Sequence, residues 1–154
     1  MRSINPDGTF ERTEFEPLVV RSFDENDTTA GSPHFETPRI EFSDGLGRLI
    51  RVDEVVRIND DGTPSATPQT WTTRYRYDLN DRLTRITDAL NNVKELRYDG
   101  LERKVWMNDP DAGISTNAYD AASNLMETVD AKGHRIRYTY DRANPMLTVF
   151  DADP

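Results

Sequence analysis

A Tyr-Asp pair recurs at a fixed interval of 21 residues along the second half of this chain. The pairs are Tyr77-Asp78, Tyr98-Asp99, Tyr119-Asp120 and Tyr140-Asp141. An earlier copy begins at Ser43, 34 residues before Tyr77, and keeps the surrounding sequence, since "DGLGRLI" matches the later "DGLERKV". A short fixed period of this kind is typical of a repeat architecture, in which one small structural element is stacked on the next.

Each repeat predicts two short strands joined by two turns. If the Tyr position is offset zero, offset one is Asp in all five copies, and offsets two to five are rich in Gly, Asn, Asp, Ala and Pro, which favour a turn. Offsets six and nine are apolar in four of five copies, and offset eleven is always acidic. Offsets six and nine have opposite parity, so the first strand requires either a β-bulge or burial on both faces.

The second strand of each repeat shows the alternation of a half-exposed β-strand. In "HRIRYTYD", Ile136, Tyr138 and Tyr140 share one face, and "TWTTRYRYD" has the same pattern. Two five-residue strands cannot bury a face alone, so successive hairpins must stack into one sheet. The sequence therefore predicts an all-β fold of stacked antiparallel β-hairpins, with no helix longer than about two turns.

The repeated Tyr and Asp residues are expected to hold this stack together. The Asp is expected to close its turn through its carboxylate and backbone amides, and the Tyr column to form a cross-strand aromatic ladder. Sixteen of the 19 basic residues are Arg, which suits a lattice of Tyr, Asp and Arg, although a codon bias would explain the excess equally well. The predicted structural repeat positions are Tyr77, Asp78, Tyr98, Asp99, Tyr119, Asp120, Tyr140 and Asp141.

The composition narrows the possible functions. Only 35% of the residues are hydrophobic and 31% are charged, so a thick core is not expected. The net charge of -9 argues against nucleic acid as a partner, because phosphate binding needs a basic face. Without cysteine the chain has no disulfide and no thiolate chemistry. No apolar run approaches the ~20 residues that span a bilayer, so no membrane insertion by this segment is expected.

No motif predicts catalysis, a metal site or a cofactor. The two histidines, His34 and His134, follow turn residues without a recognisable catalytic partner, and we interpret both as surface residues. The Asp column could suggest calcium, but calcium-binding β-rolls repeat about every nine residues with paired glycines. Turn closure is therefore the favoured role of the column, and we expect a protein that is not an enzyme.

The chain divides into four segments. These are an N-terminal flanking segment at 1–41 with one strand from Leu18 to Phe23, a first repeat at 42–55, an inserted loop and return strand at 56–76, and consecutive 21-residue repeats at 77–154. The last repeat is incomplete, and we interpret the chain as a fragment of a larger protein. The apolar residues near 140–150 are expected to leave an uncovered edge, through which the chain self-associates or at which it frays.

Three stretches of sequence resemble the repeats of the RHS/YD-repeat family across residues 42–151. They are "DGLGRLIRVDE", "YDGLERKVWMNDPDAG" and "YDAASNLMETVDAKGHRIRYTYD". The chain departs from the pattern at Ser43, at Asn117 in place of the return-strand Tyr, and at Asn124 and Pro145 in place of the turn Arg. In the flank, "NPDGTFERTEFEP", "FDENDT" and "SPHFETP" resemble the B-type component of bacterial insecticidal toxin complexes.

The resemblance implies a segment of a spiralling, hollow β-shell that encloses a toxic C-terminal region and protects it until delivery. The implied partners are the rest of the shell, the enclosed toxin segment and other toxin-complex components. The implied location is secreted or cell-surface as part of a larger virulence protein, although this chain carries no targeting signal. Members of the family often end the shell at a self-cleaving Asp-Pro motif, but "DPDAG" at 109–113 has different spacing, and we interpret it as an ordinary turn.

A second hypothesis belongs to another class of function. The chain could be a surface recognition module that binds carbohydrate or a partner protein through exposed aromatic side chains. Trp71 and Trp106 are the candidate recognition residues for this activity.

Overall fold

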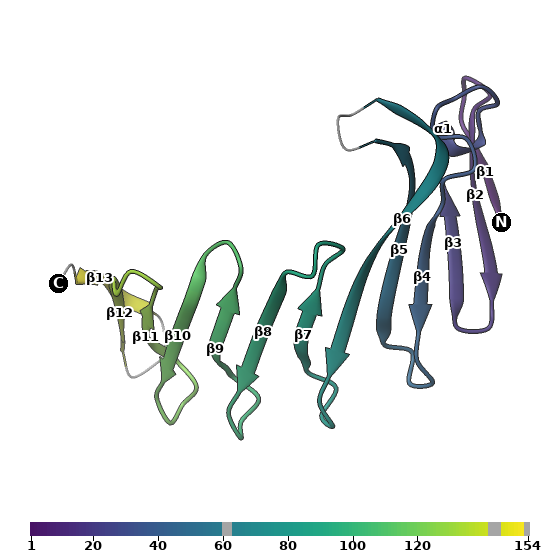
Figure 1. Cartoon of the computed structure of the whole chain (residues 1–154). Coiled ribbons are helices and arrows are strands. Elements are labelled where there is room, and N and C mark those ends of the chain that lie inside the picture. The colour runs from purple at the N-terminus through teal and green to yellow at the C-terminus, as the bar shows by residue number, and fades with distance from the viewer. Residues whose placement is uncertain (60–62, 142–145, 153–154) are drawn as a thin grey trace. The chain divides into compact units, whose positions relative to one another are not determined.

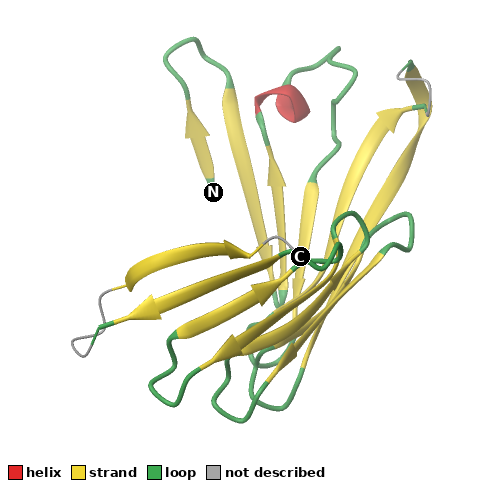
Figure 2. Ribbon diagram, turned by 90° about the vertical axis from the view of Figure 1, so that its left-hand side faces the viewer, coloured by secondary structure: helices red, strands yellow, loops and turns green. Residues whose placement is uncertain are grey.

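The computed structural model of the chain describes residues 1–59, 63–141 and 146–152. Within these residues the chain is built from β-strands and tight turns, with a single four-residue helix (Figures 1 and 2). The predicted all-β fold of antiparallel hairpins is confirmed. The chain forms two compact units: unit 1 comprises Met1–Arg76 with Thr87–Asn91, and unit 2 comprises Tyr77–Ile86 with Asn92–Pro154.

Unit 1 contains six strands that pair with each other in chain order. They are β1 (Arg2–Ile4), β2 (Phe10–Glu16), β3 (Val19–Phe23), β4 (Arg39–Ser43), β5 (Leu49–Ile58) and β6 (Pro64–Tyr77), with helix α1 (Glu25–Thr28) after β3. The predicted strand from Leu18 to Phe23 is β3. The flanking segment 1–41 contains more than that one strand, however, because β1, β2 and the start of β4 also lie in it. β1 and β2 carry no repeat signature and no strict alternation of apolar and polar residues, so the sequence did not indicate them.

The segment expected to be an inserted loop is largely a hairpin. Strand β5 continues to Ile58 and β6 begins at Pro64, and these two residues are paired. Pro, Ser and Thr in "TPSATPQT" signalled a turn, but pairing with the apolar end of β5, at Val55 and Val56, draws this stretch into the sheet. The additional residues therefore lengthen one hairpin.

Unit 2 repeats one motif of two strands and two turns. Its strands are β7 (Leu83–Thr87), β8 (Val93–Tyr98), β9 (Lys104–Asp109), β10 (Gly113–Tyr119), β11 (Leu125–Val129), β12 (Arg135–Tyr140) and β13 (Met146–Ala152). The turn at 142–145 lies outside the described residues. So do the side chains of residues 146–148 and 150, on which the expected apolar edge depends; Val149 is 51% exposed.

A β-bulge resolves the opposite parity of offsets six and nine in the repeats whose strand register is known. Arg97 pairs with Trp106, but the next residue, Tyr98, pairs with Lys104, so Val105 is an extra residue on β9. The same shift occurs where β10 meets β11 and where β4 meets β5. The extra residue turns offset six onto the face that carries the Tyr and offset nine, so that the apolar positions of a repeat share one face.

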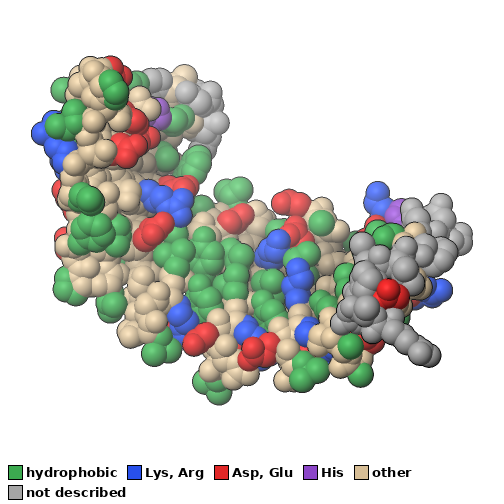
Figure 3. Space-filling view, turned by 180° about the vertical axis from the view of Figure 1, so that it is seen from behind, with side chains coloured by type: hydrophobic (Ala, Val, Ile, Leu, Met, Phe, Trp, Pro, Cys, Tyr) green, Lys and Arg blue, Asp and Glu red, His purple; other side chains and the backbone are tan. Residues whose placement is uncertain are grey.

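The sheet has almost no buried core. Among the side chains that the structure describes, Phe23 and Val52 are the buried hydrophobic ones, at 5% and 4% exposure, and both lie in unit 1. Strands β7 and β9 are half-buried on both faces, whereas β10 alternates half-buried with exposed residues, as expected for a sheet without a second layer. Figure 3 shows hydrophobic side chains over the strands and paired acidic and basic side chains along the turns. Contacts at the turns must therefore help to hold the sheet together.

Candidate functional site

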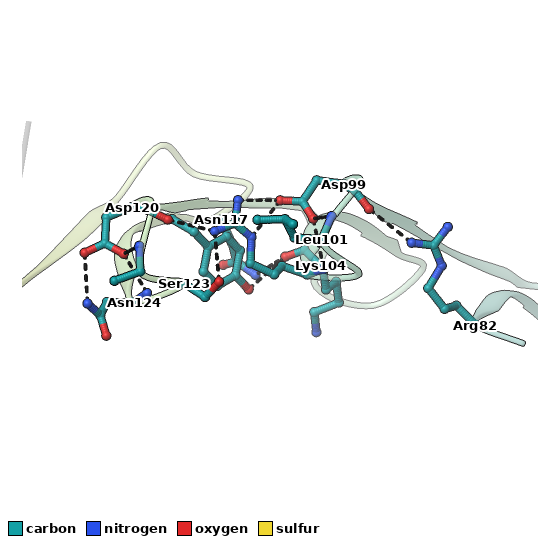
Figure 4. Close-up of polar contacts among 11 residues, drawn as sticks. Arg82, Asp99, Leu101, Lys104, Asn117, Asp120, Ser123 and Asn124 are labelled. Carbon is teal, nitrogen blue, oxygen red and sulfur yellow. Dashed lines mark hydrogen bonds and ion pairs between the residues drawn. The ribbon is translucent and has the colours of Figure 1, made fainter. Parts of the chain in front are cut away.

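An aspartate closes the first turn of the repeat in each of the four turns that the structure describes. In the turn at 99–103, one carboxylate oxygen of Asp99 accepts hydrogen bonds from the backbone amides of Leu101 and Arg103 at 2.9 and 3.0 Å (Figure 4). Asp44, Asp78 and Asp120 accept from the amides two and four residues further on in the same way. The turn geometry predicted from the Tyr-Asp pairs is present in all four turns. The last such residue, Asp141, precedes the undescribed turn at 142–145.

An arginine connects each of two turns in unit 2 to the next. Arg103 pairs with the other oxygen of Asp99 through two nitrogens at 2.7 Å, and its Nη1 donates to the backbone carbonyl of Asp120 at 2.8 Å. Arg82 repeats this arrangement between Asp78 and the carbonyl of Asp99. We call these two side chains the arginine bridges. A guanidinium can serve both partners because its five donors lie in a rigid plane.

The tyrosines lie beneath the arginine bridges. The guanidinium of Arg82 is 5.2 Å from the ring centre of Tyr98, and that of Arg103 is 4.9 Å from Tyr119. Each hydroxyl donates to a backbone carbonyl 15 residues earlier: Tyr98 to Leu83, Tyr119 to Lys104 and Tyr140 to Leu125. Tyr77 ends β6.

These contacts differ from the expected ladder of tyrosine on tyrosine. Tyr98 and Tyr119 end β8 and β10, and β9 lies between those strands. Alternate strands of a sheet are about 10 Å apart, beyond the ~7 Å limit for aromatic contact. The arginine from the intervening turn fills the gap, so the ladder alternates arginine with tyrosine.

The bridges also set the charge of the turns. The arginine side chain in the same turn lowers the pKa of Asp44, Asp78 and Asp99. For Asp120, the side-chain amide of Asn124 has the leading effect in the same direction. Asp78 raises the pKa of Arg82 in return. The turns of Asp44, Asp78 and Asp99 therefore hold ion pairs at neutral pH, which favours their closed geometry.

A second column of aspartates closes the turns at the other end of the strands. Asp109 accepts from the amides of Asp111 and Ala112, and Asp130 accepts from those of Lys132 and His134. Lys94 also bonds Asp109 at 2.7 Å and has the largest effect in lowering its pKa to about 2. The sequence showed this acidic column at offset eleven but its role was not assigned. The "DPDAG" string is the turn between β9 and β10, as predicted.

Two substitutions within the repeats retain part of the lattice. Asn117, which replaces a Tyr, donates to the carbonyl of Lys104 at 3.0 Å, the same carbonyl that the hydroxyl of Tyr119 reaches. Asn124, which replaces the turn Arg, donates to the carboxylate of Asp120 at 2.9 Å (Figure 4). Short amide side chains can therefore hold the contacts within a turn.

The two tryptophans have different surroundings. Trp71 lies on β6 opposite Glu54 and is 50% exposed. Trp106 lies on β9, where the guanidinium of its cross-strand partner Arg97 is 4.2 Å from the ring. Trp71 thus offers an open aromatic surface, whereas a neighbouring side chain lies over Trp106.

Unit 1 contains an open polar pocket of about 590 Å³ beside α1. Its walls include Asp24, Asp27, His34 and Glu54. The buried Asp27 already accepts from the hydroxyl of Thr37 and from the amide of Asp24. Across residues 1–59, 63–141 and 146–152, no group of three or more His, Cys, Asp or Glu side chains is placed to hold a metal ion. No helix in those ranges is long and apolar enough to cross a membrane.

Comparison with known proteins agrees with this geometry. The family model of the RHS Repeat matches residues 65–93 and 119–152. No protein with a curated description matches the sequence. A crystal structure of TcdB2-TccC3 matches 100% of the chain with a TM-score of 0.83 and 26% identity, and the Photorhabdus luminescens Tc holotoxin pore matches 100% with a TM-score of 0.82 and 24% identity.

A structure of TcdB2-TccC3-Cdc42 matches 99% of the chain, with a TM-score of 0.79 and 24% identity. The chain spans about 8% of the length of each of these structures. The likeness therefore concerns one stretch of much larger proteins. The family match covers two stretches of the repeats, and the structural match extends over the rest of the chain, flank included. Residues 65–93 and 119–152 thus match the RHS Repeat, and the fold of the chain is similar to that of the matched stretch of TcdB2-TccC3.

Proposed function

We propose that this chain is a wall segment of an RHS β-shell that encloses and protects a toxin cargo. The observation that carries the proposal is the match of the whole chain, flank included, to TcdB2-TccC3 at a TM-score of 0.83. Its partners would be the remaining shell, the enclosed toxin segment and other toxin-complex components. The assembled protein would act outside the cell that produces it.

The construction of unit 2 supports a wall rather than a compact domain. A sheet of one layer exposes both faces, so it can separate an interior from the surrounding solvent. Such a sheet lacks a core and needs contacts from strand to strand along its length. The arginine bridges supply these contacts, because each one ties a turn to the next turn of the sheet.

A chimera tests the proposal. This chain replaces the matched segment of TcdB2-TccC3, and the purified chimera is treated with a nonspecific protease. We expect the C-terminal region of the chimera to remain as protected as in the unmodified protein, because the grafted wall closes the shell. A control chimera carries a flexible Gly-Ser segment of equal length and should lose its C-terminal region rapidly. Equal cleavage of the two chimeras would contradict the proposal.

A second function is favoured by one observation, the exposure of Trp71. An open indole on a strand can stack on the face of a sugar ring or on a partner side chain. A glycan array with the isolated chain tests this activity. Binding that disappears in Trp71→Ala and persists in Trp106→Ala would support recognition through β6, and an array without signal would argue against carbohydrate.

A further inference from the structure

Unit 2 has turns at both edges of its sheet, and the side chains that lie between neighbouring turns differ at the two edges. The first-turn edge contains the turns at 78–82, 99–103 and 120–124, and the second-turn edge contains the turns at 109–113 and 130–134. At the first-turn edge an extended arginine side chain stands between neighbouring turns. At the second-turn edge, two small residues approach each other directly.

These residues are Gly113 and Ala131. A Cβ atom added to Gly113 would lie 2.6 Å from the Cβ atom of Ala131, where ordinary contact begins at 3.4 Å. Gly113 begins β10 and Ala131 follows β11, and these two strands pair with each other. Continuing the pairing of Thr116 with Val129 sets Ala131 beside Gly113, at the spacing of about 4.8 Å between neighbouring strands. A side chain on Gly113 would enter that space, so its absence makes room for Ala131.

Gly133 provides a natural comparison. Both glycines have a positive φ, +78° for Gly113 and +87° for Gly133, which disfavours any residue with a side chain. A Cβ atom added to Gly133 would meet nothing within 4 Å. The backbone conformation thus explains glycine at both positions, whereas the close approach is particular to Gly113.

We propose that Gly113 and Ala131 form a pinch that sets the spacing of successive repeats at the second-turn edge. A side chain at position 113 would push the strands apart at this edge alone, because the arginine bridges stand at the opposite edge, and a sheet that widens at one edge changes its curvature. The pinch is thus a curvature-setting contact. Its value for closing a shell rests on the proposed function, but the contact itself does not.

Spin labels can measure the spacing directly, because the chain contains no cysteine. Asp111→Cys with Lys132→Cys places two nitroxides on the exposed tips of the second-turn edge. Leu101→Cys with Ala122→Cys places a second pair on the first-turn edge. Dipolar broadening of each pair then reports the distance between the turns in the folded chain.

Gly113→Ala should widen the distance between the labels at positions 111 and 132 by about 1 Å. This is the movement that would restore ordinary contact between the new Cβ atom and Ala131. The distance at the first-turn edge should not change. Adding Ala131→Gly to Gly113→Ala should restore the original spacing. The matched control, Gly133→Ala, introduces the same backbone strain without the clash and should leave both distances unchanged. An unchanged distance in Gly113→Ala, or equal widening in the control, would overturn the proposal.

A second variant covers the case in which Gly113→Ala does not fold. Ala131→Val enlarges the other side of the contact at a residue that does not have a positive φ. It should widen the same distance, and an unchanged distance in this variant would also overturn the pinch. A chimera that protects its C-terminal region, combined with unchanged spacing in the variants, would refute the pinch and leave the shell function intact.

Discussion

Replacing Arg103 by Lys isolates the contribution of an arginine bridge, because it keeps the positive charge and removes the planar fork. Lys can still pair with Asp99. It cannot reproduce the two bonds to Oδ2 of that carboxylate together with the 2.8 Å bond to the carbonyl of Asp120, and it stacks less well on Tyr119. Arg103 is 20% exposed, so water replaces these contacts only in part.

The expected loss follows from the two contacts that Lys forfeits. A hydrogen bond from a charged donor to a partly buried carbonyl contributes about 1.5 kcal/mol, at the low end of its range because of the residual exposure. Stacking of a guanidinium on an aromatic ring adds about 0.5 kcal/mol. We expect Arg103→Lys to lower the free energy of unfolding by about 2 kcal/mol, or Tm by about 6 °C for a chain of this length.

Urea and thermal melts followed by far-ultraviolet circular dichroism measure this loss. The matched control is Arg135→Lys, since Arg135 is 51% exposed and pairs with Glu127 at the surface. That change should stay within about 0.5 kcal/mol of the wild type. If the two variants melted together, the arginine bridge would contribute no more than a surface ion pair, and the reasoning would be refuted.

Further predictions concern the tyrosines and the acidic turns. Tyr119→Phe should cost about 1 kcal/mol in urea melts, because it removes the bond to the carbonyl of Lys104, and a neutral result would show that the hydroxyl is dispensable. Tyr98→Ala should cost about 3 kcal/mol and exceed the loss in Asp99→Ala, and the reverse order would contradict the packing of the ring under Arg82. Carboxylates whose pKa is lowered by folding stabilise the chain above their unfolded pKa, so stability should fall as the pH drops from about 4 toward 2, the pKa of Asp109. In a pH titration of unfolding, Lys94→Met should make this fall shallower, and an unchanged slope would exclude the pair with Asp109.

The repeated part of the fold could be predicted from the sequence because the same signals recur at the same offsets. The 21-residue interval placed the strands and turns of unit 2, and the fixed Asp indicated how each first turn closes. The excess of arginine fitted a lattice with Tyr and Asp and a codon bias equally well, and Arg82 and Arg103 do form contacts of that kind. Local hydrogen bonds of this kind depend on few residues, so they can be read from a short motif.

Features that depend on pairing between strands could not be predicted in the same way. The opposite parity of offsets six and nine left two explanations open, and the register of Tyr98 against Lys104 decides for the bulge. The ladder of tyrosines was wrong because spacing along the chain does not show that a strand lies between Tyr98 and Tyr119. The hairpin of β5 and β6 was missed because its turn-like residues are held in the sheet by their partner strand.

The approach of Gly113 to Ala131 is another feature that depends on how strands pair and that the sequence does not reveal. A glycine in an acidic turn is explained by its positive φ alone, and the sequence offers no sign that a neighbouring turn lies against it. The distance between successive turns is a property of the assembled sheet.

Cryo-electron microscopy of the chimera tests the central claim most directly, since it shows whether this chain forms part of a closed β-shell. We predict that the grafted residues follow the path of the segment that they replace, with the side chain of Arg103 bridging from Asp99 to the backbone of Asp120. A shell with a gap at the graft, or a graft folded apart from the neighbouring strands, would contradict the account.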